Sequence, residues 1–296
     1  MSVMSPRPNF FLIGAPKCGT TTLWKCLKSH AKIFMCTPKE PHYFARLSRG
    51  DPERTWEDYI DLFRGGTDEP VVGEASTSSL MKPESASYIY DRLGEEVHLL
   101  AILRDPVERA FSHYLHFVRA GAEHDTFEEA IRKEEKRLEN GTPVTHAYRD
   151  LGMYGSRLAP FYEYFGDDRI KVVLFEDFID RPGDVLREIG HFLGIDASFD
   201  VEKGLQENHR PSSTSRRAQI LDWLCAGWYQ YGIHRGRVFR TIDRYIVRNH
   251  QPQLAPRPGV RRQMFETYAE DLGRLSSLTG IDTNRWHDFD LNGRTD

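Results

Sequence analysis

Hydrophobic and polar positions alternate in blocks along this chain of 296 residues. Short apolar runs, each long enough for one buried strand, stand between stretches with helical spacing of apolar residues. The apolar runs are Phe10–Ile13, Pro70–Gly73, Val97–Leu103 and Ile170–Phe175; the helical stretches lie near Thr20–Ser29, Pro83–Leu93 and Pro106–Arg119. Strands that alternate with helices are typical of βαβ units. The pattern therefore predicts an α/β fold in three layers, with a central parallel sheet flanked by helices.

Two stretches fit the sheet less well. Glu123–Glu139 carries seven acids and four bases, which predicts an exposed amphipathic helix beside a cleft. Arg216–Asn249 is basic and aromatic, which suits a substrate lid, a membrane-surface patch or an ordinary helical cap. We expect a single domain over residues 1–296, with a helical C-terminal cap and with variable segments on the substrate side at about 120–150 and 205–262.

The composition indicates the cellular location of the protein and the charge of its ligand. No apolar run approaches the 18 residues of a membrane span. Because the first strand is predicted to begin near Asn9, we expect no signal peptide or membrane anchor before it. The four cysteines form no C-x-x-C pair, so we expect neither a zinc site nor a disulfide framework, and a cytoplasmic location. The net charge of −4 conceals a basic stretch, because Lys203–Arg262 holds 12 Lys and Arg against three acids. Such a surface favours an anionic ligand.

The strongest chemical signal lies in Asn9–Leu23. A buried strand is followed by a loop bounded by Gly14 and Gly19 and by a helix that opens with three threonines. Backbone N–H groups at such a helix start bind phosphate. A nucleotide triphosphatase loop would place lysine directly after the second glycine, where this chain has Thr20, while Lys17 lies inside the loop. The loop therefore predicts a P-loop-like cradle that departs from the ATP pattern.

A second signal lies at the end of the strand Val97–Leu103. Arg104 follows it directly, at the carboxyl end where open α/β sheets bind ligands. Asp105 suits a helix N-cap, with Glu108 at the capping-box position. The Arg104 guanidinium can bind a phosphate through two hydrogen bonds, and the hydroxyl of Ser112, two turns further on, can donate another.

Together the two segments resemble those that bind the phosphosulfate and the 3′-phosphate in PAPS-dependent sulfotransferases, where PAPS is 3′-phosphoadenosine 5′-phosphosulfate. The remaining matches are supportive, and they lie at Gly73–Ser76, Gly152–Tyr154, Phe161–Phe165, Val172–Asp177, Arg181-Pro182, Phe192–Gly194 and Tyr268…Trp286. The resemblance covers most of the chain. The chain resembles the bacterial members of this family and its heparan sulfate and carbohydrate sulfotransferase branch.

The resemblance implies the donor contacts. Lys17 would stabilise the bridging oxygen of PAPS as the leaving group gains charge, and Arg104 and Ser112 would bind the 3′-phosphate. The 5′-phosphate and the rest of the donor would be held by Cys18, Gly19, Thr20, Thr21, Thr22 and Tyr154. A basic loop would close on the donor through Arg216 or Arg217, with Arg210 as an alternative. No metal is required, because the sulfuryl group carries less charge than a phosphoryl group.

The acceptor side is expected at Lys39–Phe44. Glu40 and His42, two residues apart in an extended segment, would point the same way and face one substrate. The run resembles the Lys-Glu-x-His-Phe-Phe segment of heparan sulfate sulfotransferases, which implies Glu40 as the catalytic base and His42 as an assisting group, with His42 as the alternative base. It departs from that segment at Ala45, where those enzymes have an aspartate.

Four further residues are candidates for substrate contact. Glu74 and Ser76 follow a strand end, and His113 and His116 lie one turn apart on the helix that carries Ser112. The two histidines could equally be a surface pair, and no third ligand joins them into a metal site.

These observations predict a sulfotransferase that uses PAPS, releases 3′,5′-ADP and modifies a hydroxyl on a small molecule, lipid or glycan. We expect no nucleic-acid partner and no transmembrane segment, and a homodimer is compatible with this interpretation. A P-loop kinase is the enzyme alternative, and a non-catalytic nucleotide-binding module is the other.

Overall fold

The structure is a computed structural model that describes residues 6–50, 53–142, 146–196, 199 and 256–286. Arg210, Arg216, Arg217 and the segment Arg216–Asn249 lie outside the described residues, as does most of the basic stretch.

A parallel sheet of five strands forms the centre of the described chain, in the order β2-β3-β1-β4-β5. The strands are β1 (Phe10–Gly14), β2 (Ile33–Met35), β3 (Val71–Glu74), β4 (His98–Leu103) and β5 (Ile170–Leu174). All five residues of β1 are buried, as its central position requires. Four of these strands were expected from the sequence. The three-residue β2 was not, because so short an apolar run carries no readable period.

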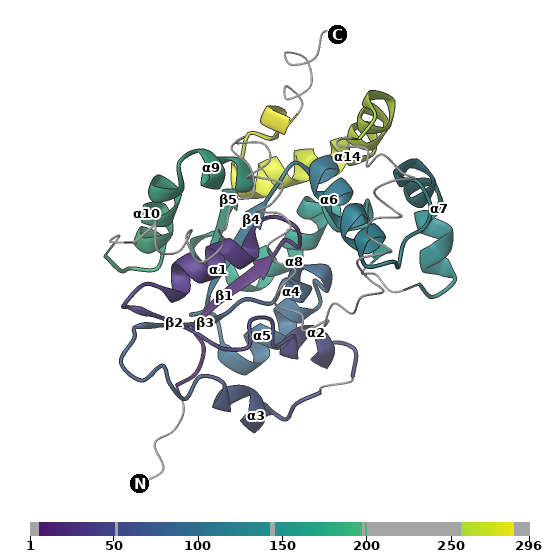
Figure 1. Ribbon diagram of the computed structural model, residues 1–296. Coiled ribbons are helices and arrows are strands. Elements are labelled where there is room, and N and C mark those ends of the chain that lie inside the picture. Colours follow the sequence, from purple (N-terminus) through teal and green to yellow (C-terminus); the bar gives the residue numbers. More distant parts are fainter. Residues whose placement is uncertain (1–5, 51–52, 143–145, 197–198, 200–255, 287–296) are drawn as a thin grey trace, which may run out of the picture.

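Helices cover both faces of the sheet (Figure 1). On one face, α1 (Thr20–Lys28) packs against β1 and β2, and α10 (Pro182–Phe192) packs against β5. On the other, α4 (Ser78–Met81) packs against β1, α8 (Tyr154–Phe165) packs against β5, and α5 (Ser85–Leu93) packs against α8. The three-layer α/β prediction is confirmed.

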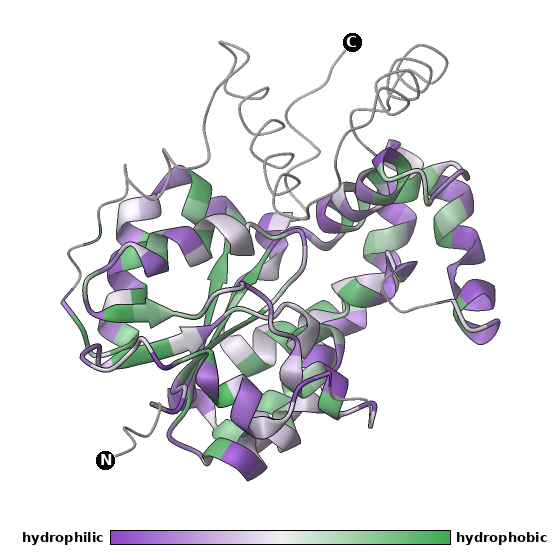
Figure 2. Cartoon of the chain, turned by 60° about the horizontal axis from the view of Figure 1, so that its bottom comes forward, coloured by the Kyte–Doolittle hydropathy of each residue, from purple (hydrophilic) through white to green (hydrophobic). Residues whose placement is uncertain are grey.

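The remaining elements surround these layers. They are α2 (Tyr43–Leu47), α3 (Trp56–Asp61), α6 (Pro106–Arg119), α7 (Phe127–Glu139), α9 (Phe175–Asp180), α14 (Pro258–Thr279) and the short 3-10 turns η2 (Asp150–Gly152), η3 (Asp167–Arg169) and η5 (Thr283–Trp286). Apolar residues concentrate in the sheet and on the helix faces turned toward it (Figure 2). Burial of that surface is the main favourable term in forming the layers.

The C-terminal helix α14 lies along α8 (Figure 1). The carboxylate of Asp271 accepts hydrogen bonds from the backbone N–H groups of Gly155 and Ser156, each 2.8 Å long, and from the Ser156 hydroxyl at 2.6 Å. These N–H groups belong to the first turn of α8, which has no partner of its own for them. A side chain of the last long helix thus caps a helix more than 100 residues earlier.

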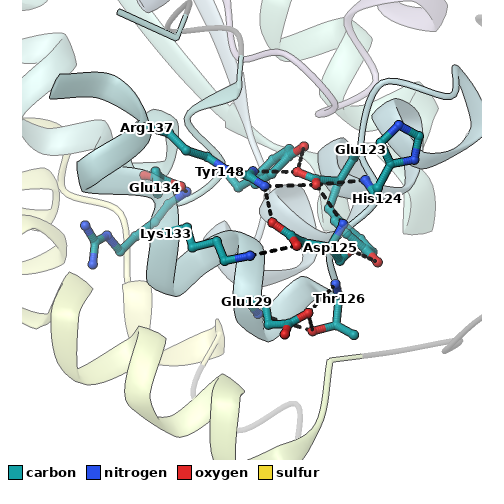
Figure 3. A network of polar contacts seen from close by, with 11 residues as sticks. Glu123, His124, Asp125, Thr126, Glu129, Lys133, Glu134, Arg137 and Tyr148 are labelled. Atoms are coloured by element: carbon teal, nitrogen blue, oxygen red, sulfur yellow. Dashed lines mark hydrogen bonds and ion pairs between the residues drawn. The ribbon is translucent and has the colours of Figure 1, made fainter. Parts of the chain in front are cut away.

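The acidic stretch differs from the sequence expectation. Helix α7 begins only at Phe127, after a capping box formed by Thr126 and Glu129. Glu123 precedes it in a loop and is buried, where it accepts hydrogen bonds from Arg137 at 2.6 and 3.0 Å and from the Tyr148 hydroxyl at 3.0 Å (Figure 3). An exposed helix over the whole of Glu123–Glu139 was therefore wrong at its start.

A second acid of this stretch also points inward. Glu134 is 1% exposed, and its carboxylate accepts the backbone N–H groups of Arg149 and Asp150 at 2.7 and 2.9 Å. Alternation of charges along a sequence cannot show this, because the partners are backbone groups of a later segment. Glu134 of α7 therefore holds the start of η2 in place.

Candidate active site

The segments that follow the strands gather at one edge of the sheet, because all five strands are parallel. β1 leads into the loop Ala15–Gly19, and its neighbours β3 and β4 lead into Ala75–Thr77 and Arg104-Asp105. β1 is also where the chain changes direction across the sheet, since β2 and β3 lie on one side of it and β4 and β5 on the other. Open α/β sheets bind ligands at such a switch point.

The loop after β1 ends in a left-handed residue. Gly19 has φ +84° and forms the N-cap of α1, where its carbonyl accepts the N–H groups of Thr22 and Leu23 at 3.1 Å. Glycine adopts this conformation without steric cost. Of the three threonines, Thr20 and Thr22 are 5% exposed and Thr21 is half-buried. The geometry agrees with an anion cradle at a helix N-terminus.

Lys17 reaches across this loop to α6. Its Nζ lies 3.5 Å from Nδ1 of His116. Burial and then the charge of Lys17 lower the pKa of His116 to about 4, so the ring is neutral at pH 7. A neutral ring leaves the positive charge at this point to the lysine.

His113, the other histidine of this pair, lies behind the site. It is 6% exposed, and its Nδ1 lies 3.4 Å from Nη1 of the fully buried Arg109. Burial, together with the charge of Arg109, lowers the pKa of His113 well below its usual range. The ring therefore offers little surface to a substrate. His116 is more exposed than His113, a difference that their spacing in the sequence does not reveal.

Arg104 is placed as expected, at the end of β4. Its guanidinium lies over the ring of Phe175, 4.9 Å from the centroid, and Nη2 lies 3.7 Å from a carboxylate oxygen of Glu108. Its Nη1 is buried and has no hydrogen-bond partner among the described residues. A buried donor without a partner is costly, and a bound anion would remove that cost. Ser112 is half-buried on α6.

Tyr154 and Cys18 support this region from within. The Tyr154 hydroxyl donates to the carbonyl oxygen of Arg104 at 2.9 Å and lies 3.7 Å from the Cys18 sulfur. Both side chains are fully buried, and burial raises the pKa of the Cys18 thiol to about 11. The sequence predicted that both residues contact PAPS. In the structure, their side chains contact each other and the backbone carbonyl groups of Arg104 and of Pro16 in the loop.

The helix start after Arg104 is capped differently from the prediction. Asp105 accepts the N–H groups of Val107 and Glu108 at 2.8 and 3.1 Å, as an N-cap should. The reciprocal bond expected from Glu108 is not made; the N–H of Asp105 donates to Glu176 at 3.0 Å. The capping-box expectation for Glu108 was therefore wrong. Its carboxylate lies near Arg104 and, at 3.4 Å, accepts from Arg261.

On the acceptor side, the expected extended segment is absent around Glu40 and His42. Both residues have left-handed backbone, with φ +63° and +57°. His42 also forms the N-cap of the short helix α2, so the chain turns here rather than running straight. The two side chains nevertheless meet, because Nε2 of His42 lies 3.8 Å from Oε2 of Glu40. The sequence predicted that the two side chains lie together, but it did not predict the left-handed backbone that brings them together.

Three consecutive hydroxyls after β3 hold this pair, and we call Ser76, Thr77 and Ser78 the hydroxyl clamp. The Ser76 hydroxyl accepts the backbone N–H of His42 at 3.1 Å. Thr77 donates to Oε2 of Glu40 at 3.0 Å, and Ser78 lies 2.8 Å from Nδ1 of His42. Ser76 was expected to contact the substrate, but it is 2% exposed and contacts the backbone of His42.

Both members of the pair have shifted acidity. Lys39 forms a close ion pair with Oε1 of Glu40. Although burial acts in the opposite direction, the charges of Lys39 and His42 and the Thr77 hydrogen bond keep the pKa of Glu40 below its usual value. Burial lowers the pKa of His42, which outweighs the nearby Glu40 charge. At pH 7 the carboxylate is ionised and the imidazole is neutral.

Glu74, the last residue of β3, lies beneath the clamp. It is 1% exposed, and its carboxylate accepts the Tyr59 hydroxyl at 3.1 Å. Burial raises its pKa to about 7 against the opposing hydrogen bonds of Ser76 and Tyr59. Glu74 was expected at the substrate surface; its burial makes it a support for Ser76.

Backbone geometry separates three residues from the rest of the described chain. Lys17, Glu40 and His42 are the described residues other than glycine with positive φ, at +69°, +63° and +57°. Left-handed backbone costs a residue with a Cβ about 1–2 kcal/mol and collects at functional sites. These are the same three residues that sequence reasoning placed at the reaction centre.

A model of the sulfotransferase domain matches residues 7–219. The chain belongs to the sulfotransferase family. The resemblance noted from its motifs is thereby confirmed.

Named relatives agree with this assignment. The chain is 26% identical over 272 residues to mouse carbohydrate sulfotransferase 15, covering 72% of this chain and 48% of the relative. It is 25% identical over 248 residues to human heparan sulfate glucosamine 3-O-sulfotransferase 3B1, covering 81% and 59%. The chain thus spans about half the length of the curated relatives it matches.

A solved sulfotransferase from Alicyclobacillus acidocaldarius has a similar structure. It is 28% identical, with a TM-score of 0.70, and the match covers 95% of this chain and 99% of that one. The described part of the chain therefore has the P-loop-like sulfotransferase fold.

Within the residues that the structure describes, no three His, Cys, Asp or Glu side chains gather as a potential metal site. None of the described helices combines the length and apolar character needed to cross a bilayer.

Sequence reasoning missed the residues that join this sulfotransferase site to the C-terminal part of the chain. Arg261 on α14 forms a close ion pair with Asp105 and donates to the carbonyl of Trp286 at 3.0 Å. The Trp286 indole N–H donates to Glu176 at 3.3 Å. Trp286 had been noted only as a match at the chain end, and Arg261 only as one charge of a basic stretch.

Proposed function

We propose that this chain transfers a sulfuryl group from PAPS to an acceptor hydroxyl and releases 3′,5′-ADP. The observation that carries the proposal is the left-handed backbone shared by Lys17, Glu40 and His42. Strained positions persist where the surrounding structure imposes them, and here they coincide with one cation and one acid–base pair at the switch point of a sulfotransferase fold.

On the donor side, the loop at Gly19–Thr22 would hold the 5′-phosphate by backbone and hydroxyl donors. Arg104 would bind the 3′-phosphate, with Ser112 as a second donor. The support for Arg104 is its buried Nη1, which has no hydrogen-bond partner among the described residues. Arg104 also needs no large movement to bind, because it is already packed over Phe175.

In the transfer step, the acceptor oxygen attacks sulfur in line with the bond that joins sulfur to the bridging oxygen. That bond breaks, and its electron pair leaves with 3′,5′-ADP. Lys17 would stabilise the negative charge that develops on the bridging oxygen. Stabilisation of developing charge by a preorganised group is often the largest contribution to enzymatic rate enhancement. The Glu40–His42 pair would take the proton of the acceptor.

We further propose that the reaction needs no metal and that the protein is cytoplasmic. The position of Lys17 supports the first proposal, and the buried free thiols of Cys18, Cys26 and Cys36 support the second. The acceptor would be a small molecule, lipid or glycan hydroxyl. Retention of activity in EDTA and fractionation of the native cell would test these points.

The deciding experiment incubates the full chain with ³⁵S-labelled PAPS and a panel of phenols, sterols, hydroxylated lipids and glycans. Label appearing in an acceptor together with stoichiometric 3′,5′-ADP supports transfer. Parallel incubation with γ-labelled ATP and Mg²⁺ tests the kinase alternative, and labelled phosphate in any acceptor would overturn the proposal. Tight 3′,5′-ADP binding without turnover across the whole panel would favour the non-catalytic module.

A further inference from the structure

The peptide group between Arg104 and Asp105 is held at both of its polar ends. Its carbonyl oxygen accepts the Tyr154 hydroxyl at 2.9 Å, and its N–H donates to Oε1 of Glu176 at 3.0 Å. Both partners contact Trp286, because the indole N–H donates to Oε2 of Glu176 at 3.3 Å and the indole ring lies 6.1 Å from the Tyr154 ring, centroid to centroid. Trp286, the last residue that the structure describes, therefore helps to fix the backbone that carries the Arg104 side chain.

Arg261, in the first turn of α14, closes these contacts into a ring. Its guanidinium donates to the carbonyl oxygen of Trp286 at 3.0 Å and forms a close ion pair with Oδ2 of Asp105. From Asp105, the backbone N–H leads to Glu176, and the Glu176 carboxylate leads back to Trp286. Buried hydrogen bonds that are joined in this way strengthen one another, so the loss of one member loosens the rest.

Arg261 also balances charge beside Arg104. Nη1 of Arg261 lies 3.4 Å from Oε1 of Glu108, and Nη2 of Arg104 lies 3.7 Å from Oε2 of the same carboxylate. Asp105 and Glu108 are thus two acids next to Arg104, and Arg261 pairs with both. The side chains of Arg261 and Asp105 are 8% and 6% exposed, so salt screens their interaction little. Without Arg261, the charge of these two carboxylates would oppose a phosphate bound at Arg104.

We propose that Arg261 and Trp286 are positioning residues that set the preference of the donor site for a nucleotide with a 3′-phosphate. Both are buried and would act through other groups: Trp286 fixes the peptide group after Arg104, and Arg261 neutralises the acids beside it. The inference rests on the proposed role of Arg104 in binding the 3′-phosphate. The 5′-phosphate, which 3′,5′-ADP and 5′-AMP share, is assigned to the loop at Gly19–Thr22, so its binding should not depend on these two residues.

The first arm of the test measures the affinities of the full chain for 3′,5′-ADP and 5′-AMP by isothermal titration. In Arg261→Gln we expect the ratio of the two affinities to fall about 3- to 20-fold, the range for substitutions that act on a ligand without touching it, with the affinity for 5′-AMP nearly unchanged. Arg262→Gln, at an exposed position on the same helix, is the control. A wild-type ratio in Arg261→Gln, with a melting curve that shows a folded protein, would overturn the proposal.

The second arm uses Trp286→Phe, which keeps an aromatic ring and removes the indole N–H that donates to Glu176. The ratio of affinities should fall in the same direction, by about two- to fivefold, the size expected for one neutral hydrogen bond. An unchanged ratio in this variant would contradict the role of Trp286.

A double-mutant cycle separates charge balance from a purely structural role. In the wild type, Arg261 already neutralises Glu108, so Glu108→Gln should raise the ratio of affinities more in the Arg261→Gln background than in the wild type. Removal of a charge would not repair a packing defect. Equal effects of Glu108→Gln in the two backgrounds would contradict charge balance by Arg261.

The same titrations distinguish a failure of this inference from a failure of the proposed donor site. Equal wild-type affinity for 3′,5′-ADP and 5′-AMP would overturn both. A wild-type preference for 3′,5′-ADP that is lost in Arg104→Ala but kept in Arg261→Gln would overturn only the inference.

Discussion

The proposed donor and acceptor halves of the site are built in different ways. The donor half rests on long elements: Lys17 and Gly19 lie between β1 and the nine-residue α1, and Arg104 lies between β4 and the 14-residue α6. The acceptor half rests on the five-residue α2 and the four-residue α4. There, left-handed backbone and the hydroxyl clamp hold the side chains. The donor half is therefore positioned by the ends of strands and long helices, whereas the acceptor half is positioned largely by side-chain hydrogen bonds.

This difference predicts different consequences of mutation. A change on the donor half should alter nucleotide affinity or the stabilisation of the leaving group. A change on the acceptor half should alter proton transfer or acceptor choice while leaving donor affinity intact. The variants below test that separation, beginning with the largest expected effect.

Lys17→Ala should have the largest effect. Removal of the charge beside the bridging oxygen is expected to lower kcat about 10²–10³-fold, the cost of losing one positioned transition-state donor. The initial rate of 3′,5′-ADP release measures this. Lys136→Ala, an exposed lysine on α7, is the matched control. Full turnover by Lys17→Ala would exclude Lys17 from the reaction centre.

Glu74→Gln tests the buried support of the acceptor half. Burial raises the pKa of Glu74 from 4.5 to about 7, so between these values the folded protein keeps a proton that the unfolded chain releases. Stability contributed by this group is present below pH 4.5 and is lost as the pH rises through 7. The variant cannot ionise, so its stability relative to wild type should rise by about 3 kcal/mol between pH 4 and pH 8.

Urea unfolding at several pH values measures the Glu74 effect. Glu57→Gln, at an exposed position on α3, is the control. Parallel curves for wild type and Glu74→Gln would show that Glu74 is not protonated in the folded protein near neutral pH.

Arg104→Ala should weaken recognition of the 3′-phosphate. The wild type is expected to prefer 3′,5′-ADP over 5′-AMP, and the variant should lose about 1.5–3 kcal/mol of that preference, the range for a charged hydrogen bond. Competition binding with both nucleotides measures it, and Arg132→Ala on α7 is an exposed control. An unchanged ratio of affinities would place the 3′-phosphate elsewhere.

Asp271→Ala should have the smallest effect on the site. It removes three hydrogen bonds at the start of α8, and loss of a helix cap costs about 0.5–2 kcal/mol of stability. A lower melting temperature with unchanged nucleotide affinity is expected, with the exposed neighbour Glu270→Ala as control. Lost affinity at full stability would show that α14 acts on the site directly.

The sequence predicted those features that depend on neighbouring residues. Asp105 could be recognised as an N-cap because its partners lie two and three residues away. Lys17 and Arg104 could be placed because a strand and a helix border each of them.

Features that depend on distant residues could not be predicted. The ion-pair partner of Asp105, Arg261, is 156 residues away, and the hydroxyls of the clamp lie 34 to 37 residues beyond the groups of Glu40 and His42 that they contact. The left-handed backbone of Glu40 and His42 was missed because local preference disfavours it, so only the surrounding structure can impose it.

The central claim is that the loop around Lys17, together with Arg104, forms a site for a 3′-phosphorylated adenylate. Isothermal titration of the full chain with 3′,5′-ADP, 5′-AMP and Mg²⁺–ATP tests it most directly, because no acceptor is needed. The account predicts that 3′,5′-ADP binds at least about tenfold tighter than 5′-AMP, a difference of 1.4 kcal/mol or more, and binds equally well in EDTA. Equal affinity for 5′-AMP, or tighter binding of Mg²⁺–ATP, would contradict it.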